Sequence, residues 1–494
     1  MAETQEAVEY EKDDSTPLSQ TISRRMLMFF VIGDVLGAGI YALVGEVGGK
    51  TGGAIWAAFL FALALAIFTA FAYAELVTKY PKAAGAALYV NKAFKLPFVT
   101  FIVAFAVMCS GLASAATLSR AFGGDYLSAF VSWDAVLVGL GFLVVISLIN
   151  MRGIKESMRF NFVLTMIEVS GLVLVTIIGV AFLTDGGGDP GRALDFKADT
   201  GVFAAILAGA GLAFFALIGF EDSVNLAEEA RKPKFDYPWA LFGGLAVAGI
   251  IYLLVTVVAS MAVPTDKLAG SDGPLLEVTS QGPLAVNDKV FSVIALFALA
   301  NGALINMIMA SRLMYGMARE GILPRVFAKV HPRRRTPWVA ILFTSLLAAG
   351  LLVTGELEQL ADTTVLLLLL VFAVVNACVL ILRRDEVKGE YFRSPTIMPV
   401  IGFIVSLALL TTKDSESFVR AGVLLVIGAV PYLITWFTHG RHTKELRTAE
   451  MKKINDPRCA SFSALAGAGS SAPGAGPARC RRHAGRPRVP PRSG

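Results

Sequence analysis

Two hydrophobic segments of the chain carry glycines at the points where a helix would cross the middle of a membrane. The first runs from Gly33 to Ile40 and reads GDVLGAGI, and the second runs from Phe214 to Glu221 and reads FFALIGFE. Glycine weakens a helix, and non-helical backbone at membrane depth persists only where protein or a watery cavity surrounds it. Paired interruptions in corresponding halves of a membrane protein indicate a transport site. The pattern therefore predicts a site for a small molecule that carries both a positive and a negative charge.

Each break would expose backbone groups that a continuous helix satisfies internally. Free N–H groups at the start of the half-helix after the first break suit a carboxylate. Carbonyl groups at the end of a half-helix suit an ammonium group or a sodium ion. The predicted carboxylate donors are the amides of Ala38, Gly39 and Ile40. The predicted ammonium acceptors are carbonyls of Val35 or Leu36, together with Phe215, Ala216 and Ile218.

A simpler interpretation is that these glycines only let helices pack closely, as small residues often do in membrane bundles. The two breaks favour a site instead, because they fall in the first spans of two five-helix halves. The predicted walls of the pocket are polar or aromatic residues of the neighbouring spans. They are Ser110, Ser114, Phe220, Asn301 and Asn306.

Three acidic residues lie within or beside the apolar segments, where a charge is costly and usually faces a cavity or a partner. Asp34 precedes the first break, Glu168 lies in the middle of the fifth span, and Glu221 follows the second break. Our hypothesis is that Glu168 and Asp34 form a like-charge pair, which would make one of them a proton acceptor near neutral pH. The two could instead bind sodium. Glu221 is a gating candidate, or it only caps the broken helix.

Composition places these residues in a membrane protein. The chain has 494 residues, of which 55% are hydrophobic and 17% charged, whereas a soluble domain has about 25% charged residues. A membrane-spanning helix needs about 20 apolar residues. Twelve segments meet this requirement and predict an all-α polytopic fold: 26–48, 54–77, 98–122, 135–151, 160–183, 201–222, 238–263, 289–318, 337–354, 360–382, 396–412 and 418–438.

The distribution of charge predicts the topology and the domain boundaries. Lysines and arginines gather in alternate loops, which predicts that both termini are cytoplasmic. We expect residues 1–25 to form a cytoplasmic segment, 26–440 a transmembrane domain, and 441–494 a cytoplasmic tail that is disordered from about 459. Residues 458–494 hold seven arginines and no acid, so the net charge of +6 belongs to the tail. We therefore expect no nucleic-acid partner.

Catalytic signatures do not stand out in the sequence. The four histidines lie outside the predicted spans, and the cysteines have no metal-ligand spacing. We expect no cofactor, no metal and no enzymatic activity. A membrane-embedded enzyme would cluster ligands within the spans, and a sensor would carry a soluble signalling domain.

Several segments resemble the amino acid–polyamine–organocation permeases. Gly37–Ile40 matches the signature of their first span, and the sequence after Phe214 matches their sixth span and its exit at 227–233. Residues 312–324 match the end of the eighth span, and 153–157 resemble the cationic amino acid transporter branch. The resemblance covers about residues 20–440. It implies the leucine-transporter fold, which has two inverted five-helix repeats plus two further helices.

The resemblance also implies a function, secondary active transport of an amino acid by alternating access. The expected setting is the plasma membrane, and the expected coupling is proton symport, with sodium as the alternative ion. A carrier of polyamines or other organic cations and an amino acid exchanger are the alternatives. Glu168 departs from several proton-coupled relatives, which carry a lysine at that position, so the mechanism based on that lysine does not transfer to this chain.

Overall fold

The computed structural model describes residues 22–81, 85–152, 158–197, 201–281, 287–334, 336–387 and 390–454. Within these ranges the chain is helical, and its β pairings are two isolated bridges. Most of the predicted segment 1–25, the residues 153–157 that carry part of the resemblance, and the tail from 459 onward lie outside the described residues. By its contacts the chain divides into Met1–Leu433 and Ile434–Gly494.

The described residues include nine helices that are long and apolar enough to cross a membrane, and one bent pair that makes a tenth span. The pair is α1 (Arg24–Val35) and α2 (Gly39–Thr51), whose axes differ by 45°. The others are α3 (Ile55–Lys79), α5 (Pro97–Phe122), α7 (Ala135–Arg152), α8 (Met158–Thr184), α9 (Val202–Ala213) with the turns that follow it, α10 (Pro233–Ala262), α13 (Asp288–Arg319), α15 (Leu357–Leu382) and α17 (Ser415–Ile454).

Two shorter apolar helices occupy the remaining predicted positions, α14 (Trp338–Thr354) and α16 (Ile397–Leu410). Every predicted span thus coincides with an apolar helix, and the predicted all-α fold class is confirmed. A total of twelve crossings requires both short helices to span the bilayer, which stays a prediction. The two breaks fall in the first helix of each successive set of five, as two inverted repeats require.

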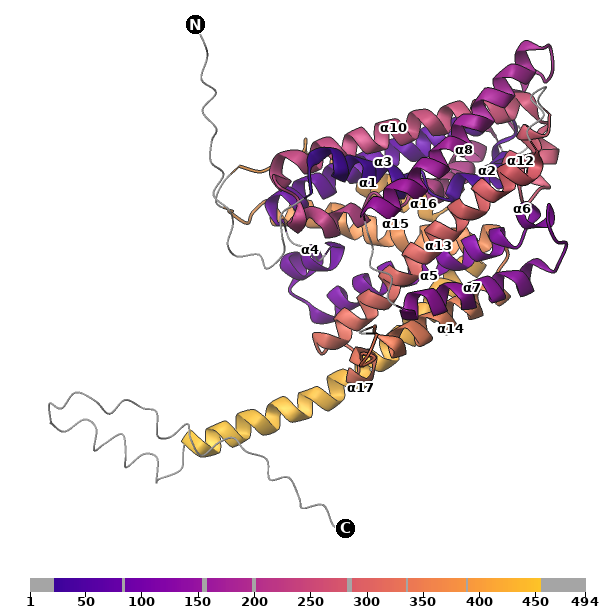
Figure 1. Ribbon diagram of the computed structural model, residues 1–494. Coiled ribbons are helices and arrows are strands. Elements are labelled where there is room, and N and C mark those ends of the chain that lie inside the picture. The colour runs from indigo at the N-terminus through magenta and orange to yellow at the C-terminus, as the bar shows by residue number, and fades with distance from the viewer. Residues whose placement is uncertain are drawn as a thin grey trace, which may run out of the picture. The chain divides into compact units, whose positions relative to one another are not determined.

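The helices pack in two groups around the breaks (Figure 1). In one group α10 packs against α1 and α3, and α3 packs against α9; in the other, α5, α7, α13 and α14 pack together. Small residues permit the close approach in the first group, as in other membrane bundles. A β-carbon at Gly244 of α10 would lie 2.5 Å from Val31 of α1, and one at Gly249 would lie 2.3 Å from Leu63 of α3.

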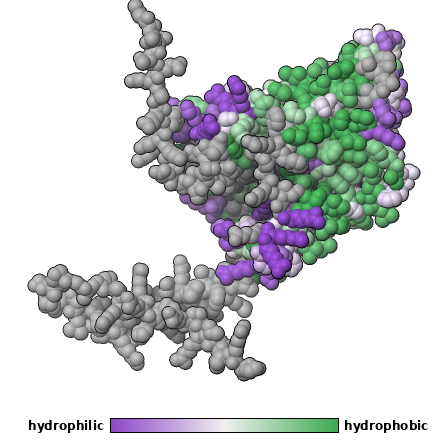
Figure 2. All heavy atoms as spheres, in the orientation of Figure 1, coloured by the Kyte–Doolittle hydropathy of each residue, from purple (hydrophilic) through white to green (hydrophobic). Residues whose placement is uncertain are grey.

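The outer surface of the bundle is apolar between two polar ends (Figure 2). Leu137, Leu346 and Val419 expose 69%, 63% and 66% of their surface. Exposed apolar residues in such numbers form the surface of a protein that faces lipid rather than water. The chain is therefore a multi-span membrane protein.

Within the described ranges, six short helices other than those at the second break lie between the spans and are absent from the predicted set. They are α4 (Gly85–Phe94), α6 (Asp125–Ser128), α11 (Thr265–Ala269), α12 (Pro274–Thr279), and the 3₁₀ helices η1 (Pro190–Leu194) and η4 (Arg325–Ala328). Two of them cover one end of the bundle. Leu268 of α11 and Leu275 of α12 are fully buried, and a β-carbon at Gly45 of α2 would lie 2.1 Å from the carbonyl oxygen of Leu268.

Candidate substrate and coupling site

The first break separates α1 from α2. The helix α1 ends at Val35, residues 36–38 are not helical, and α2 begins at Gly39. The first amides of a helix have no acceptor within it. The amides of Ala38, Gly39 and Ile40 are buried, and they have no acceptor in the part of the chain that the structure describes. The predicted donors therefore are available at the start of α2, where the helix dipole is positive.

The second break follows α9. A 3₁₀ turn, η2 (Phe214–Leu217), leads into an extended Ile218, and Gly219 has a φ of +126°. Only glycine adopts that backbone conformation without strain. Space requires glycine here as well, because a β-carbon would lie 2.8 Å from the carbonyl oxygen of Asp34. The chain then continues into the 3₁₀ helix η3 (Asp222–Glu229). Gly219 thus brings the second break onto the end of α1.

A tyrosine of α10 links the two breaks. The hydroxyl of Tyr252 lies 2.5 Å from the carbonyl oxygen of Val35 and 2.9 Å from that of Ala216. A hydroxyl has one proton, so it donates to one of these oxygens at a time. Both carbonyls are predicted ammonium acceptors, and each keeps a lone pair beyond the one that faces Tyr252. The carbonyl of Phe215 accepts from the amide of Ile218 at 3.4 Å.

Asp34 and Glu168 each carry a buried carboxylate oxygen without a hydrogen-bond partner among the described residues. The other oxygen of Glu168, Oε1, accepts from Nδ2 of Asn301 at 3.0 Å. Thr165, one turn before Glu168 on α8, also has an unpartnered hydroxyl, and its side chain fills the space beside Gly33. Buried polar atoms are nearly always paired in proteins. The crossing of α1 and α8 therefore holds three oxygen atoms that lack a donor or a cation.

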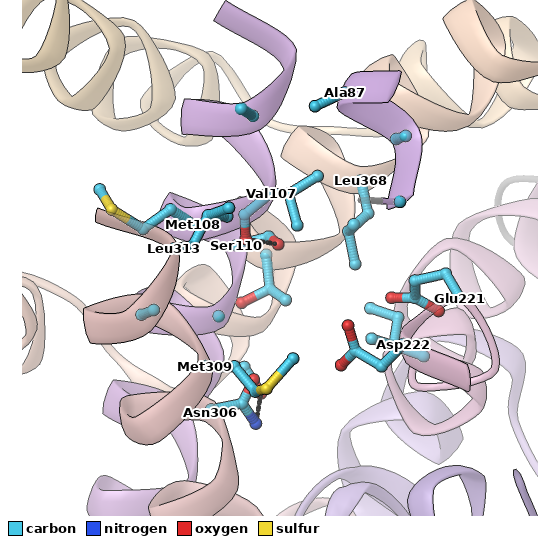
Figure 3. A pocket seen from close by; sticks show the side chains of 18 of the residues that line it. Ala87, Val107, Met108, Ser110, Glu221, Asp222, Asn306, Met309, Leu313 and Leu368 are labelled. Atoms are coloured by element: carbon cyan, nitrogen blue, oxygen red, sulfur yellow. Dashed lines mark hydrogen bonds between the residues drawn. The ribbon is translucent and has the colours of Figure 1, made fainter. Parts of the chain in front are cut away.

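A cavity of about 350 Å³ lies beside the second break. Its wall includes five predicted residues: Ser110, Ser114, Ile218, Glu221 and Asn306. Figure 3 shows Glu221 and Asp222 on one side of the cavity and Ser110 and Asn306 on the other. Nδ2 of Asn306 donates to the hydroxyl of Ser114 at 3.2 Å, and Oε2 of Glu221 accepts from the amide of Gly219 at 2.9 Å.

Two predicted wall residues do not line this cavity. Asn301 donates to Glu168 instead, and Phe220 is fully buried, with its ring centroid 6.0 Å from that of Tyr73 and 5.5 Å from that of Phe372. The substrate-binding residues predicted in the breaks lie outside the wall too, apart from Ile218. Sequence reasoning missed some members of the wall. These are Tyr73, Met108, Asp222, Met309, Arg312 and Thr364.

Of these residues, Asp222 could have been predicted from the sequence, because it is the second of two consecutive acidic residues at the end of the second helix break. The sequence places Arg312 near the inner end of the eighth predicted span and Glu228 and Glu229 after the sixth, which predicts an ion pair between them at a cytoplasmic gate. The structure places Arg312 in the cavity wall. The side chains of the two glutamates lie outside the described residues.

Ion pairs tie the helices together at the end that α11 and α12 cover. Lys50 of α2 pairs with Glu358 of α15 at 2.6 Å, and Lys413 pairs with Asp362 at 2.5 Å. Glu358, Asp362 and Asp414 have carboxylate oxygens within 4.8 Å of one another. Because lysines pair with two of these acids, the cluster is a network of ion pairs.

Comparison with known proteins agrees with this architecture. Residues 22–436 match the family model described as amino acid permease. The chain is 26% identical to the methylthioribose transporter of Bacillus subtilis (85% of this chain, 94% of that protein) and 25% identical to its branched-chain amino acid permease (83% and 91%). It is 29% identical to the chloroplastic cationic amino acid transporter 9 of Arabidopsis thaliana (74% and 66%).

The family and these three relatives are named as permeases or transporters, and none is named as an enzyme. The predicted resemblance to the amino acid–polyamine–organocation superfamily is confirmed, and the cationic amino acid transporter branch is represented among the relatives. The chain therefore belongs to the amino acid permease family of membrane transporters.

Proposed function

We propose that this chain is a secondary active amino acid permease that works by alternating access. The observation that carries the proposal is the group of buried amides at Ala38, Gly39 and Ile40, which have no acceptor among the described residues. A buried N–H without a partner is costly, so such a group favours an anionic ligand. The carboxylate of an amino acid supplies the missing acceptor.

The carbonyls beside these amides suit the other end of an amino acid. Val35 and Ala216 each present an oxygen to Tyr252, and neither helix break contains a basic side chain. An α-ammonium group near them would donate hydrogen bonds to these two carbonyl oxygens, which otherwise share the single proton of the Tyr252 hydroxyl. Ile218 belongs to the second break and also to the cavity wall, so the substrate's side chain would extend past it into the cavity.

The wall of the cavity favours a substrate with a cationic side chain. Glu221 and Asp222 face the space from one side, while Ser110 and Asn306 provide neutral polar groups on the other (Figure 3). The wall also contains Ser114 and one base, Arg312, so its acids outnumber its bases by two to one. Paired acids attract an organic cation and disfavour an anion. The same acids support the second candidate, transport of a polyamine, which would occupy the cavity without using the amides of α2.

The asymmetry of the structure supports alternating access. At one end α2 is packed against α11, and Lys50 pairs with Glu358. Towards the other end the cavity is bordered by residues 85–87 of α4. Exposure of one central site to one side at a time is the general behaviour of carriers with broken helices. The predicted topology, with both termini in the cytoplasm of a plasma-membrane protein, would make α4 cytoplasmic.

Proton symport is the proposed coupling, with Glu168 and Asp34 as its acceptors. Each has a buried oxygen without a partner in the part of the chain that the structure describes, and Asn301 offers Glu168 a neutral donor rather than a cation. Protonation of a carboxyl group supplies the missing donor, and binding of sodium would satisfy the same oxygens, including that of Thr165. These two ions therefore are alternatives that the coupling assay must separate.

The test is uptake by the full-length protein in proteoliposomes. A panel of labelled cationic and neutral amino acids and a polyamine is offered under separately imposed proton and sodium gradients, and without a gradient but with unlabelled amino acid inside. We expect accumulation of a cationic amino acid driven by the proton gradient. Accumulation only with sodium would reassign the ion, and uptake only in exchange for internal amino acid would indicate an antiporter. Uptake of the polyamine alone, or of nothing, would overturn the proposal.

A further inference from the structure

A second hollow, independent of the cavity above, lies between α14 and α17. It is a groove of about 530 Å³. Both helices are apolar, and residues along the groove such as Leu346 and Val423 expose more than half of their surface. In a membrane protein such a surface faces lipid. We name this hollow the α14–α17 groove, and it runs from Thr354 and Ser415 at one end to Leu346 and Ile427 at the other.

The α14–α17 groove is polar at one end only. The last residue of α14, Thr354, and the first residue of α17, Ser415, both line this end of the groove. Glu416 and Arg420 line it as well. From Thr354 back to Leu346 the α14 wall extends about 12 Å, at about 1.5 Å per residue, and towards that end its lining is aliphatic. A wall with charge at one end and hydrocarbon beyond it matches an amphiphile, with its head at the membrane surface and its tail towards the centre.

Arg420 lacks an anionic partner in the described part of the chain. Its guanidinium donates to neutral oxygens: the carbonyls of Gln359 at 3.4 Å and Thr354 at 3.3 Å, and Oε1 of Gln359 at 3.1 Å. An arginine within a membrane helix is costly and usually pairs with an anion or reaches the interface. Because a guanidinium binds phosphate with well-directed hydrogen bonds, the head end of the groove offers a phosphate site.

Glu416 places a negative charge one helical turn from Arg420. The side chain of Gln359 lies between the two, since its Nε2 donates to Oε2 of Glu416 at 3.1 Å and its Oε1 accepts from Arg420. The head end therefore presents one anion and one cation that do not pair with each other. This arrangement is complementary to a head group that carries a phosphate and an ammonium.

We propose that the α14–α17 groove binds an ethanolamine phospholipid from the surrounding bilayer. Its phosphate contacts Arg420, its ammonium contacts Glu416, and one acyl chain lies along the groove. The surroundings of Gly350 favour this position for the acyl chain. A β-carbon at Gly350 would meet nothing within 4 Å, so the α14 wall is open at the middle of the groove.

Gly350 is also the best position for a test variant. A large side chain there enters empty space, and replacing a glycine within a helix does not weaken the helix. Gly350→Phe should fill the groove without disturbing the fold. Gly141→Phe is the matched control: Gly141 of α7 has the same open surroundings and lines a different apolar groove, of about 920 Å³, whose wall contains no charged residue. Arg420→Gln and Glu416→Gln test the two head-group contacts.

The experiment is native mass spectrometry of the full-length protein in detergent, titrated with phosphatidylethanolamine, phosphatidylcholine and phosphatidylglycerol of identical acyl chains. We expect the wild type and Gly141→Phe to retain phosphatidylethanolamine preferentially. Arg420→Gln should lose about tenfold in retention, as expected for a lost charge-assisted contact. Gly350→Phe should also lose retention, because its ring occupies the space of the acyl chain. Glu416→Gln should abolish the preference for ethanolamine over glycerol.

Equal retention of the three lipids by the wild type would overturn the proposal, as would unchanged retention in Gly350→Phe with its thermal stability intact. A second copy of the chain seated in the groove is the competing occupant. It would appear as a dimer that Gly350→Phe dissociates while lipid retention stays the same, and this outcome also overturns the proposal. Transport activity does not enter the measurement, so the result is independent of the proposed function.

Discussion

Gly39 and Ala216 hold the two helix breaks in backbone contact. A β-carbon at Gly39 would lie 2.6 Å from Cα of Ala216 and 3.2 Å from its backbone nitrogen. The obstructing atoms are backbone, so no rotation of a side chain relieves the overlap. Gly39 is required for this close approach, and the start of α2 cannot move far without η2.

Gly39→Ala is therefore expected to push the breaks apart and abolish transport. Overpacking of a well-packed site costs about 1–3 kcal/mol, so the melting temperature in detergent should fall while the protein still folds. Gly141→Ala is the control, because a β-carbon at Gly141 meets nothing within 4 Å. Initial uptake rates and thermal melting of both variants are the measurements. Wild-type uptake by Gly39→Ala would show that the breaks do not depend on this contact.

Tyr252→Phe is expected to weaken substrate binding more than folding. The variant removes the one hydroxyl that faces both Val35 and Ala216, at a cost of about 0.5–1.5 kcal/mol for the lost hydrogen bond. Without it the two carbonyls are no longer held together, so we expect the KM for uptake to rise severalfold.

Tyr237→Phe is the matched control for this prediction. Tyr237 is another buried tyrosine of α10, and its hydroxyl lies 2.9 Å from that of Ser223, which follows the second break, rather than beside the carbonyls of Val35 and Ala216. It should lose similar stability with little change in KM. Equal changes in KM for the two variants would mean that Tyr252 contributes only to packing.

The sequence predicts the spans well because each one contains about 20 apolar residues. It predicts the breaks because glycines fall in the middle of the first and sixth spans, which correspond in two five-helix halves. Ser114 and Asn306 are predicted wall residues because they are polar residues of spans that neighbour the breaks, and both line the cavity. Asn301 lies on the same helix as Asn306 but on another face, and it bonds to Glu168. A sequence does not reveal the rotation of α13 that separates these two asparagines.

Contacts between distant segments also escaped prediction. Tyr252 is one of several aromatic residues in an apolar helix, and nothing in its local sequence indicates that it reaches both breaks. The short helices α11 and α12 are equally hidden, because turn signals such as Gly273-Pro274 do not distinguish an exposed loop from one that packs on α2. Tertiary packing determines both features.

Glu168→Gln is expected to abolish accumulation driven by a proton gradient while leaving exchange of amino acid across the membrane intact. The amide retains an oxygen that can accept from Asn301, so the structural contact at 3.0 Å persists while the ability to bind a proton is lost. Proteoliposome uptake with a gradient and counterflow without one separate the two activities. Glu277→Gln, at an acid that pairs with Lys267 near the surface, is the control. Accumulation at the wild-type level by Glu168→Gln would contradict the proposed role.

The buried pair of Lys413 and Asp362 is expected to stabilise the closed end of the bundle. Lys413 also donates to the carbonyl oxygen of Gly211 at 2.9 Å, so one ammonium connects α9, α15 and the turn before α17. Asp362→Asn removes the carboxylate that pairs directly with that buried charge, and breaking a buried pair in this way costs about 3–5 kcal/mol. Glu358→Gln breaks the more exposed pair with Lys50, which is worth about 0–1 kcal/mol. Thermal melting should therefore fall far more in the first variant.

The pH dependence of melting provides a further check on Lys413. Burial lowers the pKa of Lys413 below its ordinary value of 10.5, and Asp362 opposes that shift. Between the lowered pKa and 10.5 the unfolded chain binds more protons than the folded protein, so stability rises with pH in this window. Removing Asp362 lowers the pKa of Lys413 further, so Asp362→Asn should recover part of its lost stability as the pH rises. Lys413→Met combined with Asp362→Leu should melt without this dependence. If the melting temperature of Asp362→Asn lies below that of the wild type by the same amount at every pH, a buried charge is not the cause of the lost stability.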